Sequence, residues 1–419
     1  MKQIVVRALI VGLSTFPSSL GYAEGTDCSR LKGSLPDQTL PAGLARADIP
    51  IENVIVIMQE NRSFDHYFSQ LNQSEFYGHE VDGLDSGTVN IGPLPTTYVR
   101  PHSTSLCPTF IGNSWAAMHS YFDQGKMDRF PRVTLPYFDQ SDIPYDYSLA
   151  NQFAIADHYF SSVLGPTMPN RLYLMAATSR GRTGGINPAA PPLDRTIFHN
   201  LTHANITWKV YAGATPWYSV YRSLYAATHK RHVGKYKLDH FSREVVSSDF
   251  EKDLNQGTLP QVVFIDSTGP ESEHPSANIQ YGQAFVARHL QMLMASPYWK
   301  KSVAFVTYDE GGGFFDHVPP PVACKPDGAN APGGGAFDRY GFRVPLIAVS
   351  PYAKHHFISH QTYDHTSILK FIETKFNLPA LTRRDANAND LSDLFDYSLP
   401  DFSIPPLPSA ARDPSRECH

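Results

Sequence analysis

Apolar residues gather in five short, continuous runs that are rich in β-branched side chains. These runs cover residues 54–58, 207–211, 262–265, 303–308 and 344–349. Continuous rather than alternating apolarity is typical of parallel strands that helices cover on both faces. Helical patterns lie between or after the runs, most clearly at 277–295 and 367–376. The pattern predicts an α/β fold: a doubly wound, mostly parallel central sheet with helices on both faces.

The segments outside these elements are long and rich in proline and glycine. The 419 residues include 34 Pro and 28 Gly, with clusters at 319–321 and 332–335. Loops of such a sheet gather at the carboxyl ends of the strands, where ligands bind. We therefore expect long active-site loops in one catalytic domain over residues 51–398, and a Pro-rich surface tail over 399–419.

The N-terminal residues have the pattern of a secretion signal. Lys2 and Arg7 flank an apolar run at 8–16, and small residues precede a cleavage point near Ala23. We expect a signal peptide over 1–23, an N-terminal extension over 24–50, and secretion or a periplasmic location in a Gram-negative bacterium. No run reaches the roughly 18 apolar residues that a membrane-spanning helix needs.

Four cysteines fit an exported protein. Cys28, Cys107, Cys324 and Cys418 are widely spaced, without the close pairs of a structural zinc site. Two disulfides are expected, with three possible pairings, and one of them would tie down the tail through Cys418.

The charge pattern argues against a nucleic-acid partner. Lys and Arg number 35 against 40 Asp and Glu, a net charge of −5, and the basic residues are scattered along the chain. A nucleic-acid-binding surface needs a concentrated basic patch.

Acidic clusters directly follow two of the predicted strands. Glu60 and Asn61 follow the first run, and Asp309 and Glu310 follow the fourth, just before the glycines 311–313. Hard oxygen ligands that emerge from parallel strands can converge on one divalent cation. Either cluster alone could instead cap a helix or support a loop.

A hydroxyl lies near a predicted helix start. Thr167 precedes Pro169, which suits a first helical turn, and residues 172–177 read as helix. There it would face unpaired N–H groups and the positive end of the helix dipole, which favour an alkoxide and an incoming phosphate. A plain capping threonine is the alternative.

Histidine is abundant, with 18 copies. His274, His317 and His365 stand in polar stretches bounded by Gly or Pro, and each could protonate a leaving oxygen or help to bind metal. His365 has an alternative explanation within the cap of the helix at 367–376.

Four motifs occur in order between residues 51 and 378. They are Glu-Asn-Arg-Ser-Phe-Asp at 60–65, Gly-Pro-Thr-Met-Pro-Asn-Arg at 165–171, Tyr-Asp-Glu-Gly-Gly-Gly with His317 at 308–317, and Tyr-Asp-His-Thr-Ser at 363–367. Together they resemble the bacterial phospholipase C and acid phosphatase family of phosphoesterases, within the alkaline-phosphatase-like superfamily.

The resemblance implies a phosphoesterase with one metal centre and a hydroxyl nucleophile. The implied ligands are Glu60, Asn61, Asp309, Glu310 and the nucleophile Thr167. Acid phosphatases of the family usually have serine at the nucleophile position, so threonine favours the phospholipase side. Arg171, which closes the same motif, is a further candidate catalytic residue. Oxygen ligands suit calcium, magnesium or manganese, and nearby imidazoles leave zinc or iron open.

Two features depart from the family pattern. The family often carries a His-x-Trp element, whereas this chain has Asn113-Ser114-Trp115 followed by His119. Either Asn113 replaces the imidazole as a neutral hydrogen-bonding group, or His119 substitutes for it. The chain is also shorter than the large Gram-negative phospholipases, so we expect neither their additional C-terminal domains nor their twin-arginine signal.

The expected reaction is attack of Thr167 on phosphorus, with His317 as the first choice of proton donor and His274 as the second. A phosphatidylcholine-like lipid is the expected substrate, with transient membrane-surface contact through an aromatic stretch at 211–225. Two alternatives stay open: an acid phosphatase acting on monoesters, and an inactive surface-binding module with the same fold.

Overall fold

The fold is built on an eight-stranded sheet with a parallel middle. A computed structural model describes residues 27–39, 48–73, 77, 80–84, 87–92, 96–185, 195–212, 241–242, 246–267, 269–328, 337–410 and 412–418. From one edge to the other the strands are β11 (Phe357–Ser359), β4 (Ala154–Ala156), β10 (Leu346–Val349), β9 (Ser302–Tyr308), β1 (Asn53–Gln59), β8 (Val262–Asp266), β6 (Trp208–Ala212) and β7 (Phe241–Ser242). β1 pairs in parallel with both β8 and β9, and β6 pairs in parallel with β8 and β7.

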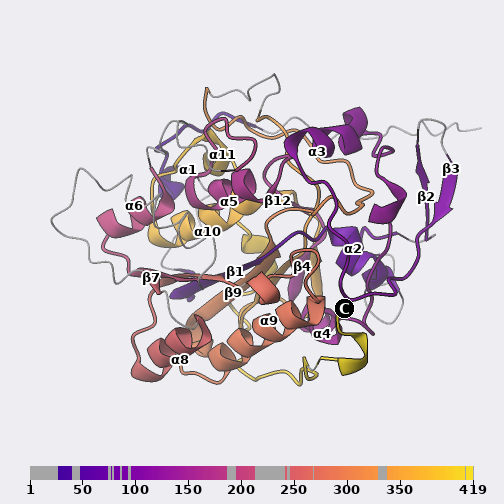
Figure 1. The fold of residues 1–419 in the computed structure, drawn as a ribbon. Coiled ribbons are helices and arrows are strands. Elements are labelled where there is room, and N and C mark those ends of the chain that lie inside the picture. Colours follow the sequence, from indigo (N-terminus) through magenta and orange to yellow (C-terminus); the bar gives the residue numbers. More distant parts are fainter. Residues whose placement is uncertain are drawn as a thin grey trace, which may run out of the picture.

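Two small sheets lie outside the main one. β5 (Tyr159–Phe160) pairs in parallel with β12 (Tyr363–Asp364), and β2 (Thr88–Ile91) pairs antiparallel with β3 (Thr96–Val99). The β2–β3 hairpin stands at the right-hand edge of the molecule in Figure 1.

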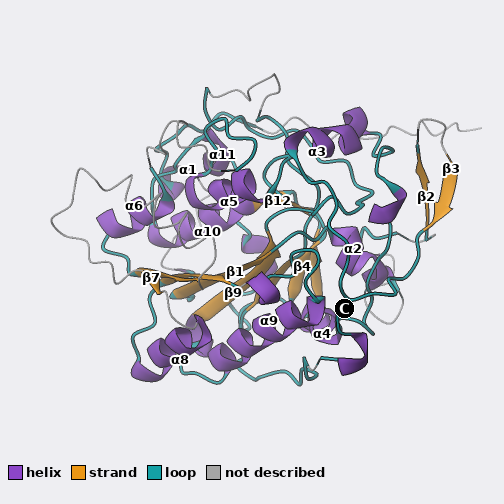
Figure 2. Cartoon of the chain, in the orientation of Figure 1, coloured by secondary structure: helices purple, strands orange, loops and turns teal. Residues whose placement is uncertain are grey.

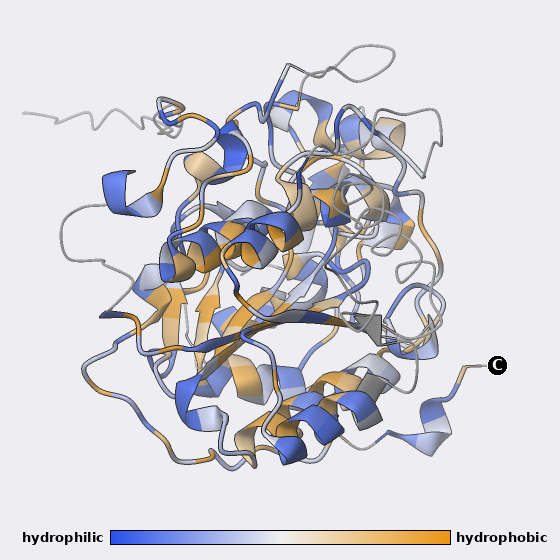
Figure 3. Ribbon diagram, turned by 90° about the vertical axis from the view of Figure 1, so that its left-hand side faces the viewer, coloured by the Kyte–Doolittle hydropathy of each residue, from blue (hydrophilic) through white to orange (hydrophobic). Residues whose placement is uncertain are grey.

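Helices cover both faces of the main sheet (Figure 1). One layer contains α1 (Pro36–Thr39), α5 (Thr167–Ala176), α6 (Ile197–His203), α10 (His365–Phe376) and α11 (Arg383–Ala386), and the other contains α4 (Pro144–Gln152), α8 (Val246–Gln256) and α9 (Ile279–Met294). α2 (Phe64–Phe68) and α3 (Trp115–Phe122) lie to one side, among the long loops drawn in teal in Figure 2. The strands are the most apolar part, and the helices turn polar residues outward (Figure 3).

The predicted fold class is confirmed. Each of the five apolar runs contributes a strand to the main sheet, and every residue of β1 and β9 is buried between the helix layers. The predicted helices correspond to α9, which Asn278 caps, and to α10, which Asp364 caps. The start of α5 lies at Thr167, ahead of the predicted 172–177.

One part of the sheet runs against the prevailing direction. β10 is antiparallel to both β9 and β4. A buried strand is apolar on both faces whichever way it runs. Its apolar pattern therefore does not indicate whether it is parallel or antiparallel to its neighbours. β4 and β11, each of three residues, are too short to produce a recognisable run.

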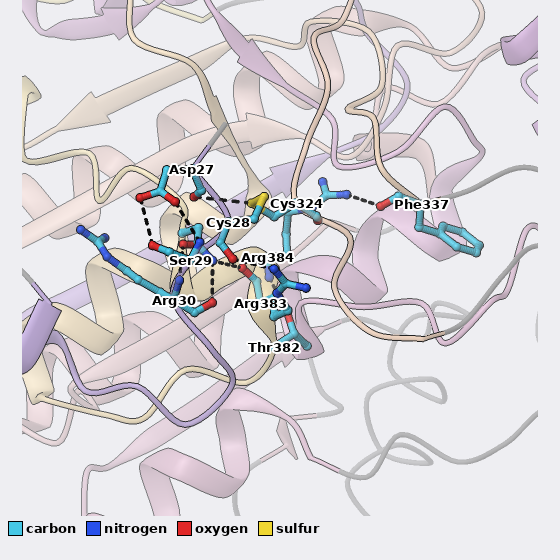
Figure 4. Close-up of a disulfide and its surroundings, with 10 residues drawn as sticks. Asp27, Cys28, Ser29, Arg30, Cys324, Phe337, Thr382, Arg383 and Arg384 are labelled. Carbon is cyan, nitrogen blue, oxygen red and sulfur yellow. Dashed lines mark hydrogen bonds between the residues drawn. A yellow bond between two sulfur atoms is a disulfide. The ribbon is translucent and has the colours of Figure 1, made fainter. Parts of the chain in front are cut away.

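Two disulfides join distant parts of the chain. They are Cys28–Cys324 and Cys107–Cys418, with sequence separations of 296 and 311 residues. Arginines of α11 donate to the carbonyls beside the first bridge, Arg383 to Cys28 and Arg384 to Cys324 (Figure 4). The second bridge ties the end of the tail to the body of the protein, as predicted.

The predicted signal peptide over 1–23 lies outside the described residues, and the division into a catalytic domain and a tail stays a prediction. Within the described part of the chain, no helix combines the length and the apolar character needed to cross a membrane.

Candidate active site

The acidic ends of β1 and β9 lie side by side. Gln59 pairs with Tyr308 in the parallel register, so the residues that follow each strand emerge at the same edge of the sheet. The Asn61 amide donates to Asp309 Oδ1 at 3.0 Å. Asn61 has a positive φ of 63°. This backbone conformation turns the chain sharply after β1.

Arg171 of α5 joins three carboxylates at this edge. Its guanidinium lies 3.1 Å from Asp309 Oδ2 and 3.5 Å from Glu60 Oε1, and it also binds Asp266 Oδ1 at the end of β8. The arginine is 1% exposed. Buried charges of this kind are stable only when they are paired. Arg171 therefore fastens the first half of α5 to the ends of three strands.

Thr167 is the first residue of α5 and approaches the same cluster. Its hydroxyl donates to Asn61 Oδ1 at 3.4 Å. The preceding loop is fixed by Asn170, whose side chain accepts from the Val163 amide at 2.9 Å and donates to the Gly165 carbonyl at 2.9 Å. The hydroxyl thus lies at a helix N-terminus, where free N–H groups favour negative charge.

Glu310 is held from two sides. Its Oε1 accepts from Asn113 Nδ2 and its Oε2 accepts from the Gly312 amide, each at 2.6 Å. A Cβ on Gly312 would lie 2.4 Å from the carbonyl oxygen of Asn61, and Gly312 has a φ of +65°. Only glycine fits this turn. Asn113 stands where the family often has histidine, and its side chain contacts Glu310, an expected metal ligand.

The charge balance of the cluster fits a divalent cation. Four carboxyl groups, those of Glu60, Asp266, Asp309 and Glu310, are all less than 10% exposed. Arg171 pairs with the first three, and Glu310 is bound by Asn113 and the Gly312 amide instead. Burial raises the pKa of Glu310, and the charge of Asp309 raises it further. Asp266 Oδ2 has no hydrogen-bond partner among the described residues. Oxygen donors in this number suit a hard divalent ion, and their excess charge favours one.

His365 is buried beneath the cluster. Its Nε2 lies 2.7 Å from the Asp309 carbonyl oxygen, and its Nδ1 lies 3.0 Å from the Tyr159 hydroxyl. Burial lowers the pKa of His365 to about 4, so the ring is neutral. A carbonyl can only accept, so these contacts assign the proton to Nε2. Nε2 therefore supports the backbone of Asp309, and Nδ1 is held by the Tyr159 hydroxyl.

His317 lies in a separate charged network. Its Nδ1 is 2.7 Å from Asp65, its Nε2 is 3.1 Å from Asp82, and Arg343 binds Asp65 at 3.0 Å. Burial acts to lower the pKa of His317, but the charge of Asp65 and the hydrogen bonds to both carboxylates outweigh it and raise the pKa to about 9. Two carboxylates thus hold the protonated ring.

His274 is connected to the cluster through its neighbours in sequence, whereas His119 is bonded within its own helix. The carbonyl of Ser272, two residues before His274, accepts from the Glu60 amide at 2.9 Å. The His274 ring stacks on Phe110, with centroids 5.7 Å apart. His119 Nδ1 contacts the Trp115 carbonyl at 2.8 Å, and burial lowers its pKa.

Among the described residues, the compact groups of His, Asp or Glu that could hold a metal ion both lie outside this cluster. In each group the ligand atoms lie within 4.8 Å of one another. They are Asp65, Asp316 and His317, and His102, Asp139 and Asp142. The first group is already neutralised by Arg343, which binds Asp65 and Asp316.

The structure thus brings Glu60, Asn61, Thr167, Arg171, Asp309 and Glu310 into one cluster. Their chemical roles stay predictions. The sequence interpretation missed Asp266, although this acid directly follows the apolar run at 262–265 and carries the same signal as Glu60 and Asp309.

Comparison with known proteins identifies the family. A family model described as the phosphoesterase family matches residues 51–379. The chain belongs to the phosphoesterase family. Non-hemolytic phospholipase C of Burkholderia pseudomallei is 30% identical over 475 residues, which cover 97% of this chain and 66% of that protein. Phospholipase C B of Mycobacterium tuberculosis is 32% identical over 426 residues, which cover 86% and 79%.

A plant protein is similar as well. Non-specific phospholipase C3 of Arabidopsis thaliana is 29% identical, with 86% of this chain and 77% of that protein covered. The chain spans just under two thirds of the length of the Burkholderia protein. The expected family is confirmed, and so is the expected enzyme class, a phosphoric ester hydrolase.

Solved structures resemble the chain only distantly. The lipoteichoic acid synthase LtaP from Listeria monocytogenes has a TM-score of 0.42 and 11% identity, covering 86% of this chain and 79% of that chain. A protein in the alkaline phosphatase superfamily from Vibrio parahaemolyticus has a TM-score of 0.40 and 11% identity, covering 82% and 70%. Similarity at this level carries no comparison of function.

Proposed function

We propose that this protein is an exported, metal-dependent phospholipase C. It would cleave phosphatidylcholine-like lipids to diacylglycerol and the phosphorylated headgroup. The observation that carries the proposal is the contact of the Thr167 hydroxyl with Asn61, beside the buried carboxylates of Asp309 and Glu310. The names of the relatives, phospholipases C from bacteria and a plant, support the substrate class.

The metal would be held by the oxygens of the cluster. The proposed ligands are Glu60, Asn61, Thr167, Asp309 and Glu310, with Arg171 neutralising part of their charge. A divalent cation bound there would lower the pKa of the attacking hydroxyl and withdraw charge from the phosphoryl oxygens. Calcium, manganese, zinc and iron are the candidates.

In the first step the Thr167 hydroxyl would release its proton to solvent, and its oxygen forms a bond to phosphorus as the bond to the glycerol oxygen breaks. The N–H groups of the first turn of α5 stabilise the negative charge that develops on the phosphoryl group. The product is a phosphothreonine enzyme and diacylglycerol. In the second step a water oxygen replaces the Thr167 oxygen on phosphorus, which releases phosphocholine, and the Thr167 oxygen takes a proton from solvent to restore the hydroxyl.

We assign the proton donor for the leaving oxygen to His274 in preference to His317. The two carboxylates that hold the His317 ring argue against a mobile proton there. His274 is two residues from the Ser272 carbonyl that binds the Glu60 amide. An imidazole at this position could donate to the glycerol oxygen and later accept a proton from water.

Phe110 would contact the apolar part of the lipid. Its side chain is 53% exposed and stacks on His274. Asn113, three residues further along the chain, binds Glu310. Three extended residues span at most roughly 11 Å, so Phe110 lies within that distance of Asn113. In the predicted aromatic rim at 211–225, Tyr211 is buried and donates to Asp253, and 213–225 lie outside the described residues.

Export is the proposed location. Two disulfides between distant segments support an oxidising compartment.

Substitution of Thr167 tests the proposed activity. Thr167→Ala should lose more activity than the roughly 10²–10³-fold that loss of one supporting donor costs, because it removes the attacking oxygen. Thr167→Ser keeps a hydroxyl and is the matched control, which should retain most of the activity. Turnover of phosphatidylcholine vesicles and of an aryl phosphate monoester, each with and without divalent metal, would be measured in parallel.

The outcomes separate the three functions. Phosphocholine release that depends on metal and on Thr167 supports the phospholipase. Hydrolysis of the monoester alone would identify an acid phosphatase. Inactivity on both substrates under every metal would indicate a binding module, and full activity of Thr167→Ala would refute the assigned nucleophile.

A further inference from the structure

Glu273 is a buried carboxylate behind the candidate metal ligands. It is 1% exposed and sits between the 3-10 helix η7 (Gly269–Glu271) and α9, with a positive φ of 67°. Burial raises its pKa to about 7, while hydrogen bonds from Tyr67 and Tyr308 and the charge of Arg62 act to lower it. A group this buried and this well bonded fixes the geometry around it.

The Glu273 segment holds the end of β1 on both sides of Glu60 and Asn61. Gln59 Nε2 donates to Glu273 Oε1 at 3.3 Å. Arg62 Nη2 donates to the Glu273 carbonyl oxygen. Between them, the Glu60 amide donates to the carbonyl of neighbouring Ser272 at 2.9 Å. The residue before and the residue after the Glu60–Asn61 pair are therefore both tied to Glu273.

The same side chain holds the end of β9. The Tyr308 hydroxyl donates to Glu273 Oε2 at 3.0 Å, and Tyr308 directly precedes Asp309 and Glu310. The Tyr67 hydroxyl of α2 donates to the same oxygen. One carboxylate thus connects the last side chains of two neighbouring strands, just before each strand delivers its acidic residues.

A glycine of α9 makes room for this carboxylate. A Cβ on Gly282 would lie 2.0 Å from Glu273 Cγ and 2.4 Å from its Oε1. Glycine inside a helix is less favourable than alanine. The position of Gly282 within the helix α9 is explained by the need to admit the Glu273 side chain.

We propose that Glu273 is a positioning residue that sets the spacing of the two acidic strand ends, and through it the affinity of the site for a divalent cation. The inference rests on the proposed metal centre. Glu273 acts through Gln59 and Tyr308 and does not touch the substrate. Removing such supporting groups behind metal ligands typically costs 10–100-fold in metal affinity.

Calorimetric titration of chelator-treated full-length protein with Mn²⁺ tests the proposal. Glu273→Ala should weaken Mn²⁺ binding about 10–100-fold. Glu273→Gln keeps the size and one acceptor oxygen and should recover part of this loss. Glu271→Gln is the matched control, because its side chain pairs with Arg288 on the surface while its carbonyl still binds Gln59. It should bind Mn²⁺ like the wild type.

Two further variants separate positioning from a general loss of stability. Gly282→Ala should push Glu273 aside and weaken Mn²⁺ binding in the same direction. Tyr308→Phe removes the β9 hydroxyl that donates to Glu273. It takes the place of Glu273→Ala in the test if that variant does not fold. At saturating Mn²⁺ the KM of the folded variants should match that of the wild type, because the buried Glu273 side chain contacts Gln59 and Tyr308 and not the substrate.

The results distinguish failure of this inference from failure of the metal centre. Wild-type Mn²⁺ affinity in both Glu273→Gln and Tyr308→Phe, with Glu310→Gln strongly weakened, would overturn the positioning role alone. Unchanged binding in Glu310→Gln would overturn the metal centre itself, and this inference with it. Weaker binding in the Glu273 and Tyr308 variants with unchanged KM supports the proposal.

Discussion

Gly312→Ala perturbs the geometry of the site without replacing any polar side chain. The alanine would have to adopt a φ of +65°, which costs a non-glycine residue about 1–2 kcal/mol. Its Cβ would also lie 2.4 Å from the Asn61 carbonyl oxygen and 2.9 Å from the Asn61 carbonyl carbon. Because those atoms belong to the backbone, relief requires the turn to move by more than half an ångström, and overpacking of this kind adds about 1–3 kcal/mol.

This movement acts on catalysis as well as on stability. The Gly312 amide is one of the two donors that hold Glu310, at 2.6 Å. Misplacement by about 1 Å at a site can reduce the rate roughly 10²-fold. We therefore expect Gly312→Ala to lose about 2–5 kcal/mol of unfolding free energy and roughly 10²-fold in kcat/KM.

Urea unfolding and initial rates on phosphatidylcholine vesicles would measure the two effects. Gly184→Ala is the matched control, because a Cβ there meets nothing within 4 Å and its φ is not positive. A Gly312→Ala protein with the stability and activity of the Gly184→Ala control would refute the assigned packing of Gly312 against Asn61.

Three further predictions concern charge and cross-links. Arg171→Met should lower the unfolding free energy by about 3–5 kcal/mol, since it leaves buried carboxylates unpaired; an unchanged urea midpoint would count against this. His317 titrates near 6.5 when unfolded and near 9 when folded, so its stabilisation is complete below pH 6.5 and is lost as pH rises toward 9. The Tm of wild type should therefore fall more than that of His317→Gln across this interval, and parallel curves would contradict it. Replacing Cys28 and Cys324 by serine should cost about 2–5 kcal/mol in urea unfolding, and no loss would argue against the bridge.

The sheet could be predicted from sequence because strands that are buried on both faces form continuous apolar runs. β1, β8 and β9 are such runs, and their parallel pairing follows from the alternating helices. The reversed direction of β10 could not be predicted, since the long segment between β9 and β10 allows either direction.

The candidate site was only partly predictable. Glu60 and Asp309 were found because acids at the ends of neighbouring parallel strands must lie close together. The ion pairs of Arg171 depend on how α5 packs over the strand ends, and no local pattern encodes that packing. The surroundings of His317 and His365 likewise arise from residues far away in sequence, such as Asp65 and Tyr159.

Glu273 shows a second limit. Its position beside His274 is visible in the sequence, but its bonds to Gln59 and Tyr308 arise only when β1 and β9 pair. A buried acid of this kind gives no signal from periodicity, because a single polar residue in a turn looks the same whether it is exposed or enclosed.

Anomalous X-ray diffraction from crystals of the protein grown with Mn²⁺ would locate the proposed metal centre. We expect one strong peak at the ends of β1 and β9, within about 2.0–2.6 Å of oxygens of Glu60, Asp309 and Glu310 and close to Thr167. A peak at Asp65, Asp316 and His317 or at His102, Asp139 and Asp142, with none at the strand ends, would contradict it.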